Sequence, residues 1–91
     1  MPLRFEWDRE KATANLLKHR VSFEEASSVF LDPLARIFDD EDHSGGEPRE
    51  IITGRSIFGR LLVVSFTERG ADVIRMISAR AATRREREDY E

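Results

Sequence analysis

The stretch LLVVSFT, residues 61–67, is a nearly continuous apolar run, and it decides the fold class. A short run of this kind, rich in β-branched residues and bounded by turns, predicts a strand at the centre of a sheet. Residues 49–57 and 73–79 flank it, and residues 34–38 form a further apolar segment. Such short connections favour an antiparallel meander. Within the meander, Gly54 indicates a bulge or a close approach of another backbone.

The first third of the chain predicts a strand and two helices. Residues 3–7 alternate between apolar and polar side chains, and Asp8 can then cap a helix that runs to about His19. Ser22 and Glu25 have the spacing of a capping box and open the second helix. In the first helix we expect one side to face the core and another to be polar; the core side holds Ala12, Leu16 and Leu17, and the polar side holds Lys11, Asn15 and Lys18.

The end of the chain predicts a short polar helix, because Thr83 and Glu86 form a second capping box. The predicted fold is α+β: an antiparallel meander with the two N-terminal helices packed on it, a short C-terminal helix, and all helices on one face. With 91 residues the chain is too short for two cores, so residues 1–91 are expected to be a single domain.

Composition narrows the class of protein. Hydrophobic residues make up 40% and charged residues 36% of the chain, which suits a folded core with a solvated surface. No cysteine is present, so disulfides and thiolate metal sites are excluded. Because the sequence has neither a long apolar stretch nor a signal peptide, we expect a soluble, cytoplasmic protein that does not bind membranes.

The charge is unevenly distributed along the chain. Residues 1–52 hold 12 acids and 7 bases, whereas residues 53–91 hold 6 acids and 8 bases. The overall charge of −3 argues against nonspecific coating of nucleic acid but permits a local basic site. Arginine supplies 13 of the 15 basic residues, and its planar guanidinium suits phosphate.

Arg75 lies between Ile74 and Met76 inside the last predicted strand, where a guanidinium must be paired or face a groove. Arg80 ends that strand. The arginines on or beside the neighbouring strands are Arg49, Arg55, Arg60 and Arg69. The cluster predicts either a phosphate site or salt bridges to the many acids. A regular strand sends Arg75 and Arg80 to opposite faces, so they share a site only if the strand bends or ends near Ala79.

Few other residues carry chemistry. His19 can accept a proton from a ribose hydroxyl or bond the last carbonyls of its helix. Lys11 and Lys18 are either phosphate contacts or part of a solvated face. Tyr90 can stack on a base or donate its phenolic proton, whereas Trp7 at a strand–helix junction is interpreted as core.

The acidic run over residues 39–42, with Ser44 and Gly45, resembles the start of a calcium loop. The twelfth position is Ile51 rather than a glutamate, so the run is interpreted as an acidic turn. We predict no metal site and no cofactor.

Several segments together resemble the BrnT family of type II toxin–antitoxin toxins, and they span nearly the whole chain. They are FEWD (5–8) with Lys11 and Asn15, KH (18–19), VSFEEA (21–26), VF-x-DP (29–33), HS (43–44) with Glu47 and Arg49, GRLLVV (59–64), ISAR-x-AT (77–83) and ER-x-x-YE (86–91). The family usually has glycine after Lys-His, where this chain has Arg20; a positive φ there would strain the backbone.

The resemblance implies a RelE-like ribonuclease fold and metal-independent RNA cleavage that arrests translation. It also implies a BrnA-like antitoxin with a ribbon-helix-helix DNA-binding domain. The toxin would then bind operator DNA only through this antitoxin. The acidic face of residues 39–50 is one candidate surface for a basic antitoxin segment.

RNA cleavage without a metal needs a base for the 2′-hydroxyl, cations for the phosphorane-like charge and an acid for the 5′-oxygen. We expect Arg75 and Arg80 to bind the phosphate, assisted by Arg49 or Arg60. The base is then His19 or Glu47, and the acid is Tyr90 or a lysine; the further RNA-binding candidates are Lys11, Lys18 and Arg69. The alternative is a non-catalytic binding module, or a degenerate toxin that serves only as antitoxin partner and co-repressor.

Overall fold

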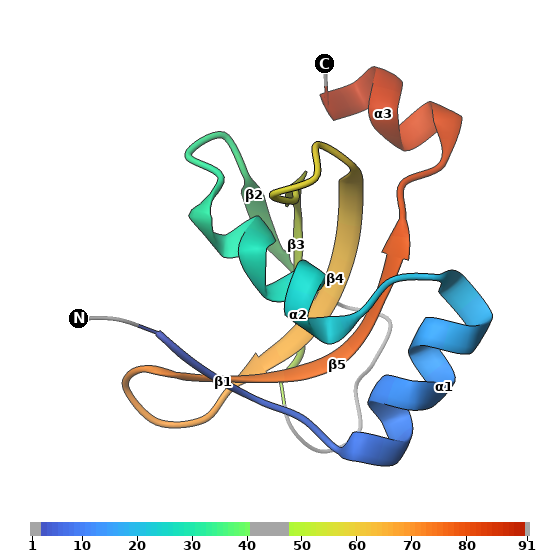
Figure 1. Cartoon of the computed structure of the whole chain (residues 1–91). Coiled ribbons are helices and arrows are strands. Elements are labelled where there is room, and N and C mark those ends of the chain that lie inside the picture. Colours follow the sequence, from blue (N-terminus) through green and yellow to red (C-terminus); the bar gives the residue numbers. More distant parts are fainter. Residues whose placement is uncertain (1–2, 41–47, 91) are drawn as a thin grey trace.

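A computed structural model describes residues 3–40 and 48–90 and shows a mixed α+β fold (Figure 1). The elements are β1 (Arg4–Glu6), α1 (Arg9–His19), α2 (Phe23–Ser28), the 3₁₀ turn η1 (Val29–Leu31), β2 (Arg36–Asp39), β3 (Glu50–Arg55), β4 (Leu61–Glu68), β5 (Val73–Ala81) and α3 (Arg84–Tyr90). The predicted strands, helices and their order are therefore confirmed for the described residues.

The five strands form one sheet in the order β1-β5-β4-β3-β2. Strands β2 to β5 are the predicted antiparallel meander, with β4 in the middle. The expectation of an entirely antiparallel sheet is wrong for β1, which pairs parallel with β5 from Arg4 opposite Val73. The reason is the crossover: α1 and α2 carry the chain from β1 at one edge of the sheet to β2 at the other.

The core lies between the sheet and the α1–α2 layer. Val21, Phe23, Ala26 and Val29 from the helical layer are fully buried. They meet inward-facing sheet residues, which include Ile52, Leu62, Val64, Phe66, Ile74 and Met76. Trp7 packs against this core, with its ring centroid 5.8 Å from that of Phe23, so its interpretation as a core residue is confirmed.

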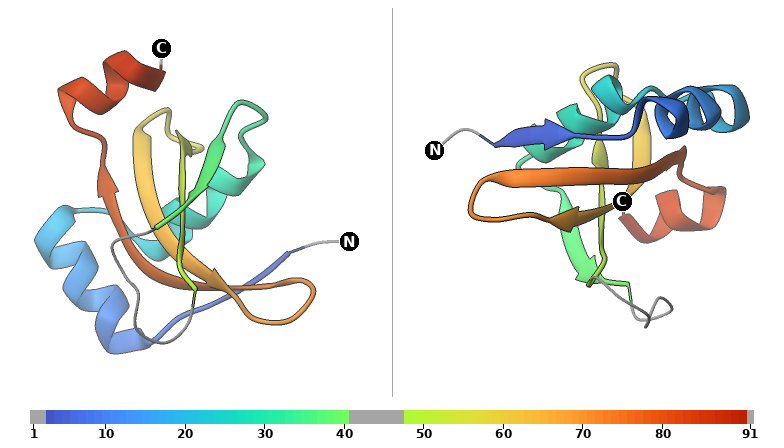
Figure 2. Two further views of the ribbon diagram at one scale, coloured as in Figure 1. Left: turned by 180° about the vertical axis from the view of Figure 1, so that it is seen from behind. Right: turned by 90° about the horizontal axis from the view of Figure 1, so that it is seen from below.

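Helix α3 lies on the other side of the sheet from α1 and α2 (Figure 2), so the prediction that all helices share one face is wrong. No residue of α3 is buried, so the helix has no apolar side that must join the core. Its Thr83–Glu86 capping box is formed in both directions, since Thr83 N donates to Glu86 and Glu86 N donates to the Thr83 hydroxyl. Glu86 also binds Arg80, and this contact draws α3 to the face on which Arg80 lies.

The faces of α1 differ from the prediction. Leu16 and Leu17 are 49% and 79% exposed, whereas Asn15, expected on a polar face, is buried. The Asn15 amide donates to Ala79 O at 2.9 Å and to Val21 O at 2.9 Å, and its oxygen accepts from Ala79 N at 3.0 Å. Strand β1 pairs with β5 only at residues 73–75, so this side-chain amide satisfies backbone groups that would otherwise be buried without partners.

Two local predictions about backbone geometry are confirmed. A Cβ on Gly54 would lie 2.8 Å from the Ala35 Cβ, so glycine is needed for the close approach of the η1–β2 segment. Arg20 has φ 58° at the end of α1, which is the left-handed conformation that a glycine would adopt without strain.

Candidate functional site

A bulge in β5 decides which arginines share a face. Ser65 lies opposite Ser78, but the next β4 residue lies opposite Met76, which leaves Ile77 as an extra residue in β5. The extra residue inverts the alternation of side chains, so Arg75 and Arg80 both point away from the core despite their odd spacing. The bulge at Ile77, rather than the expected bend near Ala79, therefore gives the two arginines a shared face.

The same outer face carries a small hollow beneath α3. Its volume is about 150 Å³, and it is lined by Arg36, Phe38, Thr53, Glu86, Asp89 and Tyr90. The β2 and β3 residues in this set alternate with inward-facing neighbours, and the other three come from α3. The hollow therefore joins the outer face of the sheet to the C-terminal helix.

Tyr90 is anchored in this hollow by Asp32. The Tyr90 hydroxyl donates to Asp32 Oδ2 at 2.7 Å, while the Asp32 carboxylate also accepts from Arg55 N at 2.8 Å and Leu34 N at 2.9 Å. The two backbone donors, Arg55 first, lower the pKa of Asp32, and the Tyr90 hydroxyl adds to them. Burial and the neighbouring Asp32 raise the pKa of Tyr90. Tyr90 is therefore a protonated donor at neutral pH.

Two guanidinium groups flank the ring of Tyr90. The Cζ atoms of Arg36 and Arg55 lie 5.8 and 5.9 Å from the ring centroid, within the range of cation–π attraction. Arg36 lines the hollow with Tyr90, whereas Arg55 lines the neighbouring depression with Asp32. A phenolic donor with cations nearby suits an anion carrying a leaving group that needs a proton.

Arg80 lies beside the hollow and is held by a two-pronged ion pair. Its two terminal nitrogens donate to the Glu86 oxygens at 2.7 and 2.9 Å. The hydrogen bonds from Arg80 lower the pKa of Glu86 to about 2, and those to Glu86 raise the pKa of Arg80. Arg80 thus binds the Glu86 carboxylate through two parallel hydrogen bonds, which is the bidentate geometry in which arginine also binds a phosphate.

Arg75 is not brought together with Arg80. It pairs with Glu6 at 2.9 Å near the other end of β5. Arg75 lies opposite Thr67 and Arg80 opposite Val63, four β4 residues apart. At about 3.3 Å per residue their backbones are separated by about 13 Å. The expected pocket around one phosphate is thus not formed by this pair, since each guanidinium binds its own carboxylate.

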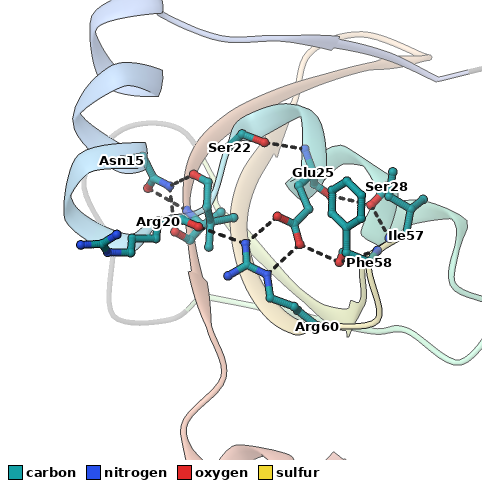
Figure 3. A network of polar contacts seen from close by, with 11 residues as sticks. Asn15, Arg20, Ser22, Glu25, Ser28, Ile57, Phe58 and Arg60 are labelled. Carbon is teal, nitrogen blue, oxygen red and sulfur yellow. Dashed lines mark hydrogen bonds and ion pairs between the residues drawn. The ribbon is translucent and has the colours of Figure 1, made fainter.

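Arg60 belongs to a structural network rather than to the hollow (Figure 3). Its guanidinium donates to both oxygens of the buried Glu25, at 2.9 Å from Nε and 2.5 Å from a terminal nitrogen, and to Arg20 O at 3.0 Å. Glu25 also accepts from Ser56 Oγ at 2.7 Å. The network connects the β3–β4 hairpin to α2 and to the end of α1. In a complete capping box the Glu25 carboxylate would instead accept a hydrogen bond from the backbone N–H of Ser22.

The remaining predicted residues are scattered. Lys11 and Lys18 are exposed and His19 is half-buried on α1, which covers the opposite face of the sheet. Arg69 lies in the β4–β5 turn and half-buried Arg49 precedes β3. Glu47, together with Glu41 and Asp42 of the acidic run, lies outside the described residues. Within residues 3–40 and 48–90, no cluster of three or more His, Asp or Glu side chains could hold a metal ion.

The sequence analysis did not select Arg36 or Asp32. Arg36 lies between apolar neighbours in a predicted strand, and this is the same signal that singled out Arg75. Asp32 was noted only as part of the VF-x-DP motif at residues 29–33. A guanidinium inside an apolar strand was therefore a usable signal, whereas the Asp32–Tyr90 contact joins residues 58 positions apart and leaves no local pattern.

Comparisons with known proteins give the class and then the family. Residues 7–86 match the model of a ribonuclease toxin of type II toxin–antitoxin systems. The chain belongs to this family, BrnT, and as a type II toxin it pairs with an antitoxin.

The fold agrees with this assignment. It is similar to the crystal structure of the Brucella abortus ribonuclease toxin BrnT, with a TM-score of 0.69 and 21% identity over 90% of this chain and 99% of that one. A search of curated proteins found no match. In the described part of the chain, every helix is too short or too polar to cross a membrane.

Proposed function

We propose that this toxin is a metal-independent endoribonuclease that cleaves RNA in the hollow beneath α3 and thereby arrests translation in the cytoplasm. The observation that carries the proposal is that the guanidinium groups of Arg36 and Arg55 lie 5.8 and 5.9 Å from the ring centroid of Tyr90, on the face that also carries Arg80. Its antitoxin is of the BrnA type, with a ribbon-helix-helix domain that binds the operator.

The reaction is an attack of the ribose 2′-oxygen on the adjacent phosphorus. The bond from phosphorus to the 5′-oxygen breaks, leaving a 2′,3′-cyclic phosphate and a 5′-hydroxyl. Arg36 and Arg55 stabilise the charge that develops on the phosphorane oxygens, and Tyr90 gives its proton to the 5′-oxygen. Of the two candidate bases, His19 lies on α1 across the sheet from the hollow, so the proton of the 2′-hydroxyl is assigned to Glu47, a residue outside the described ranges. Asp32 is a positioning residue, since it touches Tyr90 rather than the RNA.

Arg80 and Arg75 bind successive parts of the RNA. The phosphate displaces Glu86 from Arg80, an exchange of one anion for another at the same paired donors. Arg75, on the same face but about 13 Å away along the strand, contacts a neighbouring phosphate after exchange with Glu6. The candidates on α1 and in the turns, namely Lys11, Lys18, Arg49 and Arg69, contact more distant parts of the RNA.

The experiment is RNA degradation in EDTA by purified, antitoxin-free toxin. Loss of one cation that stabilises the transition state lowers the rate about 10²–10³-fold, so we expect this decrease in the cleavage rate of Arg36→Ala and of Arg80→Ala. The cleavage rate of Tyr90→Phe should fall by about 10²–10⁴-fold. Arg75→Ala should lose less. Arg84→Ala is the matched control, since its side chain is 87% exposed on α3. Full activity of both Tyr90→Phe and Arg36→Ala would contradict the proposed site.

A second function also has an observation in its favour. Arg60, Arg75 and Arg80 each hold a carboxylate, as the salt-bridge interpretation of the arginines requires. A degenerate toxin that only binds the antitoxin and acts as co-repressor would leave RNA intact in EDTA and would not slow the growth of a host without antitoxin.

A further inference from the structure

Most of the exposed large apolar side chains lie around the β2 edge of the sheet, on both of its faces. Six of them, 51–78% exposed, lie on two segments around β2 and the β3–β4 hairpin. These six, called the edge patch below, are Leu31, Leu34, Ile37, Phe38, Ile57 and Phe58. Single exposed apolar residues are ordinary, but a group of this kind marks a surface that binds a partner.

Hydrogen bonds join the two segments of the edge patch. The Asp32 carboxylate accepts from Leu34 N on one segment and from Arg55 N at the base of the hairpin. Ser28 Oγ accepts from Ile57 N at 2.9 Å, and Leu31 and Ile57 line the same shallow depression. The Glu25–Arg60 network fixes the rest of the hairpin (Figure 3). The patch is therefore held in place before any partner arrives.

The patch contains an open sheet edge. Asp40 N donates to Arg49 O, so these two residues are a hydrogen-bonded pair. Hydrogen-bonded and non-hydrogen-bonded pairs alternate along an antiparallel ladder. The backbone N–H and C=O groups of Arg36 and Phe38 therefore face β3, and those of Ile37 and Asp39 face outward. Among the described residues no strand pairs with this outer side, because β2 ends the sheet. An edge strand with apolar side chains is a template for an added strand.

Arg36 beside the edge can bind an acidic group of a partner, because Glu86 and Asp89, which line the same hollow, do not form an ion pair with it. The Arg36 guanidinium lies over the ring of Tyr90, and no carboxylate of the described residues forms an ion pair with it. The nearby Asp32 carboxylate is already used by three donors. A carboxylate on an incoming strand would meet an arginine whose donors are available.

We propose that the antitoxin binds here by adding an extended segment to the outer edge of β2, with apolar side chains on the edge patch and a carboxylate on Arg36. A carboxylate bound to Arg36 occupies the hollow beneath α3 and excludes the RNA phosphate. This effect on cleavage rests on the proposed function, which places the RNA in the same hollow. Neutralisation is then direct competition for the site.

The test measures the Kd of the toxin for its antitoxin, by displacement of labelled wild-type toxin from the complex. Ile37→Pro removes an outward N–H that β3 does not use, so the fold tolerates it at this edge. We expect its Kd to rise at least tenfold, and that of Ile37→Ala, which keeps the N–H, to rise less. Phe58→Lys should also weaken binding at least tenfold, whereas Leu17→Lys, an equally exposed change on α1, should bind normally.

Amide exchange in the wild-type complex gives a test that requires no variant to fold. The Ile37 and Asp39 amides should gain at least tenfold protection on binding the antitoxin, while the Phe38 amide, already bonded to β3, changes little. Unprotected Ile37 and Asp39 amides, or a wild-type Kd for Ile37→Pro, would overturn the proposal. Neither measurement uses RNA cleavage, so a toxin that binds as expected but leaves RNA intact contradicts the proposed function alone.

Discussion

The Glu25–Arg60 ion pair offers the sharpest test of what holds this fold together. Glu25 is only 6% exposed, and its charge is balanced by the two hydrogen bonds from Arg60. Arg60→Ala would leave that carboxylate buried without a cation. Breaking a fully buried pair costs about 3–5 kcal/mol of unfolding free energy.

The expected cost is smaller here because water reaches one partner. The Arg60 side chain is 41% exposed, so solvent replaces part of the lost interaction, and we expect a loss of about 2–3 kcal/mol. For a domain of this size, that corresponds to a fall in Tm of about 10–20 °C. Arg84→Ala is the matched control, because its 3.5 Å pair with Glu88 is exposed on both sides and should change stability by less than about 0.5 kcal/mol.

The cost should also depend on pH, with a defined sign. The hydrogen bonds from Arg60 lower the pKa of Glu25 in the folded state below its ordinary value of 4.5. The stability that this ion pair supplies is therefore present above pH 4.5 and is lost as the pH falls through the folded-state pKa. The difference between wild type and Arg60→Ala should be largest near pH 7 and shrink once Glu25 is protonated.

Urea unfolding followed by tryptophan fluorescence measures this directly. Trp7 is the single tryptophan, and its ring contacts that of Phe23 in the core. A loss below about 1 kcal/mol at pH 7, or a loss of equal size at pH 7 and pH 4, would refute the reasoning. Either result would mean that Glu25 becomes solvated in the variant.

Three further changes test other parts of the structure. Asn15→Ala removes all the side-chain hydrogen bonds to Ala79 and should cost about 2–4 kcal/mol in chemical unfolding; a cost below 1 kcal/mol would show that water takes the place of the amide. Gly54→Ala places a methyl group against a neighbouring Cβ at 2.8 Å and should cost about 1–3 kcal/mol, and an unchanged Tm would contradict this close approach. Because Arg80 holds the pKa of Glu86 at about 2, stability from that pair is present above pH 4.5 and lost toward pH 2. The amide protection factors of α3, which correct for the intrinsic exchange rate at each pH, should fall over this window in wild type but not in Glu86→Gln.

Much of the secondary structure could be predicted because its causes are local. Asp8, Ser22 and the Thr83–Glu86 pair cap helices through bonds that span two or three residues. The apolar run that became β4 is recognisable from its own composition. The predictions failed where a distant partner decides burial: Asn15 is buried because one stretch of β5 lacks a neighbouring strand, which no pattern within α1 records.

The candidate site was predicted less completely than the fold. Tyr90 and Arg80 were selected and lie at or beside the hollow, whereas Arg36 and Asp32 were not selected, and Arg75 and Arg60 lie elsewhere with carboxylates of their own. Residue type alone does not tell a paired arginine from one available to a phosphate. That distinction depends on which acid the fold places within 4 Å of it.

By itself the sequence determined the helix caps, the central strand, the need for glycine at position 54 and the membership of the BrnT family, since each depends on neighbouring residues or on motifs spread along the chain. Only the tertiary structure decided that a single extra residue, Ile77, turns Arg75 and Arg80 to one face, and that Tyr90 meets Asp32 beneath α3. The physical reason is register: side-chain direction along a strand inverts with one inserted residue, and strand pairing, rather than local propensity, fixes where that residue lies.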